Sequence, residues 1–124
     1  MTLFPTLEET LELHRILLER FGGLPGVRDL GLLQSALARP QTGYYDTRWL
    51  QAAALMQSLG RNHAFIDGNK RVAFALTAIF LRMNGHRLVV GAAEGEAFLI
   101  EDVIGGRAEL PAIAAWLERH AVST

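Results

Sequence analysis

Hydrophobic side chains recur at helical spacing through most of this chain, and capping residues precede several of the runs. Thr6 precedes the first run, and Glu9 follows it at the spacing of a capping box, so a helix should begin there. The glycines at 22 and 23 should end that helix. His14 lies on or near its apolar face, where we expect a partly buried, hydrogen-bonded histidine rather than a catalytic one.

Two more helices and a loop are predicted before the middle of the chain. Asp29 is placed to cap a short helix over residues 30–37, and Thr47 to cap a longer one over about 48–61. Between them, residues 40–46 are predicted to form a loop because of their proline, glycine and aspartate content. This half of the chain is therefore expected to be helices joined by loops.

A run over about residues 69–84 is apolar almost all round, which predicts a helix buried at the centre of a bundle. After it, residues 86–90 should be an extended connector and residues 92–104 a further helix. Pro111 suits the first turn of a last helix that reaches about His120. Strand signals are few, so the predicted fold class is all-α, a bundle of about six helices.

The composition narrows the class of protein. With 124 residues, 50% of them hydrophobic, the chain can bury one core, so we expect a single domain over residues 1–124. It has no cysteine, which excludes disulfides and thiolate metal sites and agrees with the cytoplasmic location that we expect. We expect neither a secretion signal nor a membrane span, since no apolar stretch reaches roughly 18–20 residues. The net charge of −1 predicts no direct nucleic-acid binding.

Polar groups gather in one short stretch directly before the predicted central helix. The stretch reads Asn62-His63-Ala64-Phe65-Ile66-Asp67-Gly68-Asn69-Lys70-Arg71. A glycine followed by a helix start leaves backbone N–H groups unpaired, which makes an anion site, and Lys70 and Arg71 add positive charge beside it. His63 has the chemistry of a proton acceptor near neutral pH, and Asp67 that of a Mg²⁺ ligand. These residues predict a phosphate-handling loop with a base attached.

This stretch resembles the signature of the Fic/Doc family. The pattern His-x-Phe-x-Asp-Gly-Asn-Lys-Arg fits residues 63–71. Lys70 stands where the Fic branch carries a second glycine, so the likeness is to the Doc branch. Ala64 replaces the proline that is common in Fic loops, and the Doc branch tolerates variation at that position. The similarity extends to residues 21–33 and covers about residues 7–117.

The resemblance implies a Fic/Doc-like fold and a role for each motif residue. His63 would be the general base that activates a target hydroxyl, Asp67 would hold Mg²⁺, and Phe65 would point inward to anchor the loop. The residues implied to hold ATP are Gly68, Asn69, Lys70 and Arg71. A lysine at position 70 would crowd the pose from which Fic enzymes transfer AMP, so the implied reaction is transfer of the γ-phosphate.

The resemblance also implies a biological role, that of the toxin of a toxin–antitoxin pair. The implied target is a threonine of elongation factor Tu, whose phosphorylation halts translation. The implied partner is a Phd-like antitoxin, whose flexible C-terminal segment would fold into an apolar groove lined by leucine and tryptophan side chains. Two alternatives are AMP transfer to a protein hydroxyl and a catalytically idle module that only binds its antitoxin.

Several residues keep two interpretations at this point. Asp67 is also placed like a helix cap, and Gly68 like a plain turn glycine. Arg61 either adds a phosphate contact or lies on the surface. In Fic folds a flap lies beside the active loop, and the resemblance implies that role for residues 40–46. Their two tyrosines, Tyr44 and Tyr45, are either flap contacts or ordinary loop aromatics.

Overall fold

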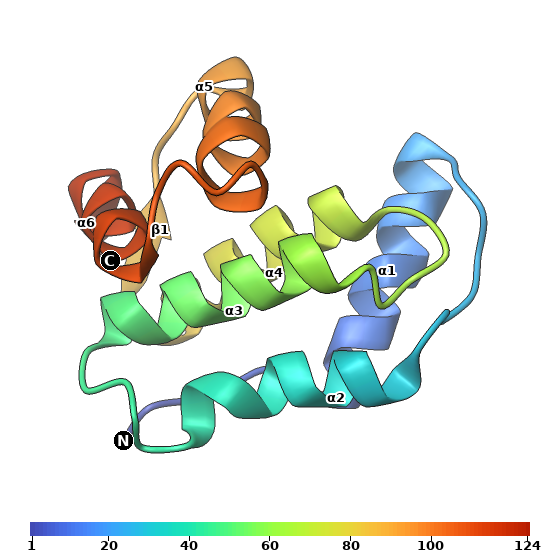
Figure 1. The fold of residues 1–124 in the computed structure, drawn as a ribbon, viewed down its shortest axis with the longest axis horizontal. Coiled ribbons are helices and arrows are strands. Elements are labelled where there is room, and N and C mark those ends of the chain that lie inside the picture. Colours follow the sequence, from blue (N-terminus) through green and yellow to red (C-terminus); the bar gives the residue numbers. More distant parts are fainter.

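The computed structural model describes residues 1–124 and consists mainly of helices (Figure 1). Its six α-helices are α1 (Leu7–Phe21), α2 (Leu30–Ala38), α3 (Arg48–Asn62), α4 (Asn69–Met83), α5 (Ala92–Ala97) and α6 (Leu110–Arg119). A 3₁₀ turn, η1 (Arg39–Gln41), extends α2, and a π-helical segment, η2 (Phe98–Ile104), extends α5. The predicted all-α bundle is confirmed.

Capping side chains set the starts of three helices, as the sequence predicted. The hydroxyl of Thr6 accepts the N–H of Glu9 at 3.1 Å, and the Glu9 carboxylate accepts the N–H of Thr6 at 2.8 Å. Asp29 and Thr47 accept first-turn N–H groups of α2 and α3 at 3.0 and 3.1 Å. Each bond satisfies an N–H group that has no partner inside its own helix.

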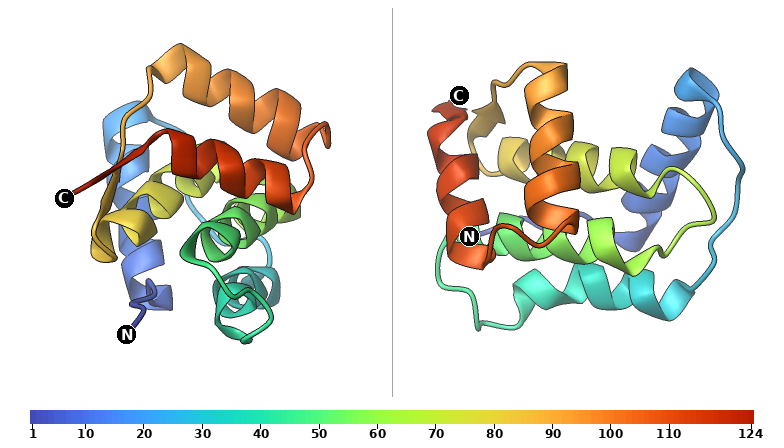
Figure 2. Two further views of the ribbon diagram at one scale, coloured as in Figure 1. Left: turned by 90° about the vertical axis from the view of Figure 1, so that its left-hand side faces the viewer. Right: turned by 45° about the horizontal axis from the view of Figure 1, so that its top comes forward.

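The centre of the molecule is a pair of helices, α3 and α4, which lie side by side and are joined by the short motif loop (Figures 1 and 2). Ala52, Ala53 and Met56 of α3 are completely buried. From α4, Leu76 and Phe80 enter the same core with exposed fractions of 1% and 0%. The predicted central position of α4 is confirmed, and α3 shares it because its alanines allow close helix packing.

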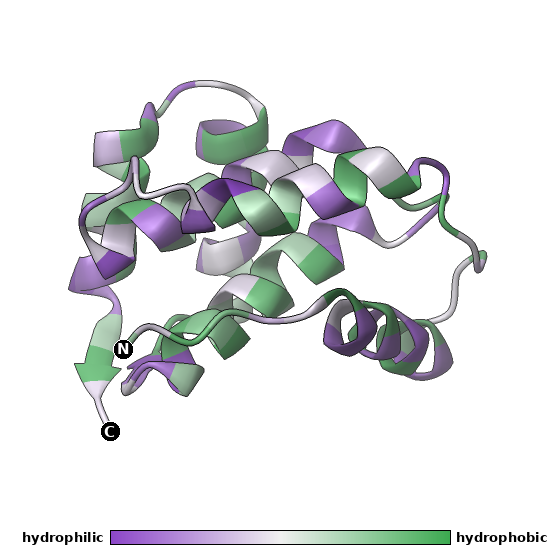
Figure 3. Cartoon of the chain, turned by 90° about the horizontal axis from the view of Figure 1, so that it is seen from below, coloured by the Kyte–Doolittle hydropathy of each residue, from purple (hydrophilic) through white to green (hydrophobic).

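The other helices cover the two sides of this pair. In Figure 2, α5 with η2 and α6 lie on one side, while α1 and α2 lie on the other. Figure 3 shows hydrophilic and hydrophobic residues sharing the helices, as expected where one face of a helix meets the core. None of the helices combines the length and the apolar character that crossing a membrane requires.

A small sheet was not predicted. Within the expected connector 86–90, β1 (His86–Leu88) pairs antiparallel with β2 (Ala121–Ser123), and Arg87 lies opposite Val122. The pairing brings the end of the chain back to the segment that follows α4. Three residues are too few for a period-two pattern, so neither strand was recognisable before its partner was known.

The loop expected to form a flap lies at the wrong end of α3 for that role. Residues 40–46 precede α3, whereas the motif loop follows it (Figure 1). The helix has 15 residues, so its ends are about 22 Å apart at 1.5 Å per residue. Tyr45 accepts a hydrogen bond from Nε of Arg39 at 2.8 Å, and Tyr44 is 84% exposed. The flap prediction is wrong, and both tyrosines are loop aromatics.

Candidate active site

His63 ends α3 in an unusual backbone conformation. Its φ of 50° and ψ of 50° lie in the left-handed region, and it is the one residue other than glycine with a positive φ. Such a conformation costs a β-carbon-bearing residue roughly 1–3 kcal/mol, and it persists only where the surroundings hold it. The residue is exposed to solvent. The turn therefore reverses the chain towards α4 and leaves the candidate base accessible.

Arg28 contacts the same turn from outside the motif. Its Nε donates to the carbonyl of His63 at 2.6 Å, and a terminal nitrogen donates to the carbonyl of Asn62 at 2.9 Å. Carbonyls in the last turn of a helix have no partner within the helix, and a guanidinium can satisfy two at once. Arg28 lies in the region that resembles the family, but the sequence alone assigns it no role. The contact joins residues 35 positions apart, and nothing local to either residue indicates it.

The segment between α1 and α2 runs beside the motif loop, where the flap was expected. Val27 and Phe65 form an isolated antiparallel bridge, and the N–H of Ile66 donates to the carbonyl of Gly26 at 3.0 Å. The N–H of Arg28 donates to the carbonyl of Ala64 at 2.8 Å. These main-chain bonds fix the motif loop against residues 22–29.

Phe65 and His14 pack beneath the loop. The Phe65 side chain is 1% exposed, which confirms the predicted inward anchor. The His14 ring stacks on it, with ring centroids 3.9 Å apart, and its Nε2 lies 2.9 Å from the carbonyl oxygen of Asp67. The expected buried, hydrogen-bonded histidine is confirmed, and α1 thereby supports the underside of the loop.

The side chain of Asn69 closes the loop on itself. Its Oδ1 accepts the N–H of Phe65 at 2.9 Å, and its Nδ2 donates to the carbonyl of the same residue at 2.9 Å. The amide thus acts as a two-point clamp across the turn that leads into α4. The sequence suggested a contact with phosphate for this side chain, and it did not reveal the clamp.

Asp67 is held by two backbone N–H groups and remains exposed. Oδ2 accepts the N–H of Leu24 at 3.0 Å, and Oδ1 accepts that of Gly68 at 2.8 Å. The bond from Leu24 and then that from Gly68 lower the pKa of the carboxyl, with a smaller effect from the Arg71 charge. Asp67 does not cap α4, because Gly68 occupies the N-cap position. The alternative interpretation of Asp67 as a helix cap is therefore wrong.

The chemistry of Asp67 fits a hard cation with few protein ligands. No group of three or more acidic, histidine or cysteine side chains stands ready to hold a metal. The exposed carboxylate keeps free lone pairs beyond its two N–H contacts. Mg²⁺ commonly takes one or two carboxylates and completes its shell with water and phosphate oxygens.

The start of α4 is a positive surface. Gly68 is the N-cap residue, with a φ of 80°, and no side chain caps the helix. The first turn of α4 contains no acidic residue. A β-carbon on Gly68 would meet the His14 ring at 3.6 Å, so it is the φ rather than crowding that requires glycine. Lys70 and Arg71 are exposed, and the Arg71 guanidinium lies 4.7 Å from the centroid of the Phe21 ring. The helix dipole and both cations therefore favour an anion here.

Arg61 has a structural contact that neither interpretation anticipated. Its Nε donates to the carbonyl of Val103 at 3.1 Å, which links the end of α3 to η2. The residue is exposed, in agreement with a surface position. The phosphate contact suggested by the sequence stays a prediction.

The comparisons with known proteins agree with this geometry. The model of the Fic/DOC family matches residues 4–81, which contain α1, α2, α3, the whole motif loop and all but the last two residues of α4. The chain belongs to the Fic/Doc family. A "Toxin Doc" of Mycolicibacterium smegmatis is 45% identical in an alignment of 112 residues that covers 83% of this chain and 84% of that protein. The "Protein kinase doc" of Escherichia phage P1 is 36% identical in an alignment of 102 residues that covers 72% of this chain and 81% of that protein. The Fic/Doc assignment rests on similarity over most of the chain as well as on the motif.

Proposed function

We propose that this Fic/Doc protein is the toxin of a toxin–antitoxin pair and transfers the γ-phosphate of ATP to a protein hydroxyl. The two relatives described above are named as a Doc toxin and a Doc protein kinase, and both align with most of this chain. The observation that carries the proposal is the pairing of an exposed imidazole, His63, with an uncapped helix start that bears Lys70 and Arg71. A base and an anion site on one short loop are the parts that phosphoryl transfer needs.

In the proposed reaction His63 takes the proton of the target hydroxyl as its oxygen attacks the γ-phosphorus. The new O–P bond forms as the bond to the β-phosphate oxygen breaks, and ADP leaves. Lys70, Arg71 and the N–H groups of the first turn of α4 hold phosphate oxygens and stabilise the charge on the transferred group. Asp67 would hold Mg²⁺, which neutralises phosphate charge. The rest of the loop keeps these groups in place.

Lys70 favours γ-phosphate transfer over AMP transfer. Its side chain is exposed in the first turn of α4, where it adds a cation at the anion site. In the Fic branch a glycine at this position leaves room for the α-phosphate next to the target, whereas a lysine narrows that space. The proposed target is a threonine of elongation factor Tu, which explains toxicity by a block of translation.

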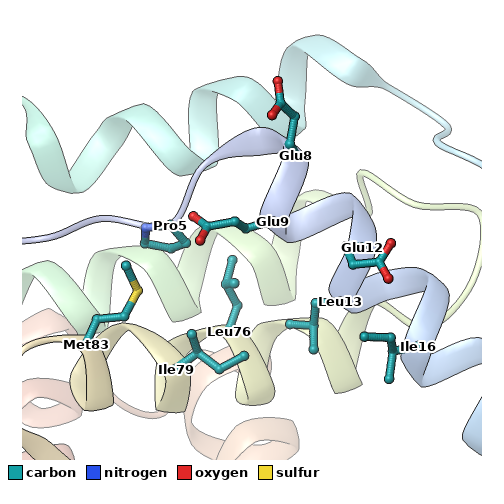
Figure 4. Close-up of a pocket in the computed structure, with 9 residues that line it drawn as sticks. All are labelled: Pro5, Glu8, Glu9, Glu12, Leu13, Ile16, Leu76, Ile79 and Met83. Carbon is teal, nitrogen blue, oxygen red and sulfur yellow. The ribbon is translucent and has the colours of Figure 1, made fainter.

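The proposed antitoxin is Phd-like and binds through an apolar segment. An apolar groove lies between α1 and α4, with aliphatic side chains on its floor and three glutamates along one side (Figure 4). The lining residues are Pro5, Glu8, Glu9, Glu12, Leu13, Ile16, Leu76, Ile79 and Met83. No tryptophan is among them, so of the two residue types expected in such a groove only leucine is present. We propose this groove as the antitoxin site.

The test is incubation of the purified chain with γ-labelled ATP, Mg²⁺ and elongation factor Tu. Label should appear on the factor. The transfer rate of a His63→Ala variant should be at least about 100-fold lower than that of the parent, since general base catalysis contributes about 10²–10⁴-fold. Arg82→Ala, which changes an exposed arginine of α4 outside the motif, is the control and should remain active. Mass spectrometry that finds AMP on the target would replace the proposed chemistry with AMP transfer.

A growth assay separates an enzyme from an idle module. Expression of the parent should arrest growth, and expression of His63→Ala should not. Equal arrest by both proteins would favour the binding module.

A second growth assay tests the proposed groove. An Ile79→Glu variant should arrest growth even with the antitoxin present, because a charge that becomes buried under the bound segment would oppose docking.

A further inference from the structure

Arg28 makes a two-point contact with the end of α3 that no motif residue provides. Its guanidinium donates to the carbonyls of Asn62 and His63 at 2.9 and 2.6 Å. These are consecutive carbonyls, and the second belongs to the residue in the left-handed conformation. Hydrogen bonds from an ionised donor are stronger than neutral ones, and the planar guanidinium fixes the angle between the two acceptors.

The position of Arg28 is itself fixed from two directions. Its own N–H and that of Asp29 both donate to the carbonyl of Ala64, at 2.8 and 3.0 Å. Asp29 also caps α2 through its side chain. The start of α2 therefore places the backbone of Arg28 directly beside the turn that its side chain holds.

We infer that Arg28 is a positioning residue that holds His63 in the left-handed conformation and so aims the imidazole at the anion site. The inference rests on the proposed function, in which His63 is the base. Without Arg28 two carbonyls lose their donors, and the strained residue can relax towards the conformations that other L-residues prefer. The imidazole would then move relative to Lys70 and Arg71, although their own places on α4 would not change.

This role predicts a specific kinetic signature in an Arg28→Ala variant. A displacement on the order of 1 Å at a reacting group can cost about 100-fold in rate, so kcat should fall by about that factor. The KM for ATP should change by less than about threefold, because groups that bind the nucleotide equally in ground and transition states are untouched. The kcat of Arg28→Lys should lie between those of the parent and Arg28→Ala, since an ammonium group reaches one carbonyl more readily than two. Arg82→Ala is the matched control and should behave as the parent does.

A spectroscopic measurement follows His63 directly. In protein labelled with ¹³C and ¹⁵N at histidine, the Cα and Cβ shifts of His63 report its backbone conformation. They should move away from left-handed values in Arg28→Ala and remain unchanged in Arg82→Ala. A folded Arg28→Ala variant with parental kcat and parental His63 shifts would overturn the inference, as would a variant altered only in its KM for ATP.

The test remains decisive if Arg28→Ala is unfolded or if the parent is inactive. If Arg28→Ala does not fold, Arg28→Lys carries the test, and parental kcat with parental His63 shifts in that variant would overturn the inference. If the parent itself transfers no phosphate, the proposed function fails. The shifts of His63 then still decide whether Arg28 holds it.

Discussion

Replacement of Asn69 by alanine tests whether this side chain holds the loop or the nucleotide. In the structure both polar atoms of the amide engage the backbone of Phe65, each at 2.9 Å. A hydrogen bond contributes about 0.5–1.5 kcal/mol net, and a backbone group left unpaired away from water raises the cost to about 1–3 kcal/mol. At the net value the two bonds give an expected loss of about 1–3 kcal/mol in the free energy of unfolding, and the loss is larger if the backbone groups of Phe65 stay unpaired. Most domains have a total of about 5–15 kcal/mol, so the variant should still fold.

The assay is urea unfolding of the parent and of Asn69→Ala, with the slope m checked for constancy. Asn69→Asp is the matched control, because a carboxylate keeps the acceptor for the Phe65 N–H and lacks the donor for its carbonyl. A negative charge at a helix start recovers about 0.3–1 kcal/mol, so the control should lose less stability than the alanine variant. The KM for ATP, measured on the same samples, reports any direct contact with the nucleotide.

One pair of results would refute this reasoning. An unfolding free energy within about 0.5 kcal/mol of the parent is typical of surface substitutions, and it would mean that the clamp contributes little. If the KM for ATP then rose more than about tenfold, a loss of roughly 1.4 kcal/mol in binding, the side chain would be a nucleotide ligand. That outcome would restore the interpretation drawn from the sequence alone.

Three further variants probe neighbouring features of the loop. Gly68→Ala should lower the free energy of unfolding by about 1–3 kcal/mol in a urea titration because of its positive φ, and an unchanged midpoint would contradict this. The pKa of Asp67 is lowered in the folded state, so its stabilisation is present above the unfolded value of about 3.9 and is lost as pH falls through the folded value. In Asp67→Asn the free energy of unfolding, measured by urea titration, should therefore fall less steeply below about pH 4 than in the parent. An unchanged pH profile would argue against the two N–H contacts. Phe21→Leu removes an exposed cation–π contact of about 0.5–1 kcal/mol with Arg71, so the KM for ATP should rise about two- to fivefold while Phe21→Trp remains near the parent.

Features of the fold that depend on neighbours in the sequence were predictable. The caps Thr6, Asp29 and Thr47 act on residues three positions later, so their role is visible in the sequence. The apolar periodicity of α4 likewise predicted a helix close to its observed bounds. The small sheet was missed because β1 and β2 are separated by α5 and α6, and nothing local to either strand indicates the other.

At the site the same distinction separates what was found from what was missed. The motif residues stand together in the sequence, so the loop and its exposed cations were recognisable. The supporting contacts come from elsewhere, namely from His14 on α1 and Arg28 before α2. The flap was placed at residues 40–46 because the family resemblance implied that role for them, yet the segment that lies beside the motif is 22–29. The position of residues 40–46 at the far end of α3, together with the main-chain contacts of residues 26–28 with the motif loop, decides between the two loops.

The motif residues divide into two sets by what their side chains touch. Phe65 and Asn69 are engaged in the core and the loop backbone, whereas His63, Lys70 and Arg71 are exposed and face solvent at the site. Under the proposed function the first set supports the second, because an imidazole can act as a base only where its backbone holds it close to the reacting group. The left-handed conformation of His63 is strained, and the Arg28 guanidinium contacts the two carbonyls of that turn. His14 and Asn69 hold the rest of the loop through the backbone of Asp67 and Phe65. Under the proposed function, most of the motif serves to hold the loop rigid, and only a few exposed side chains would take part in the reaction.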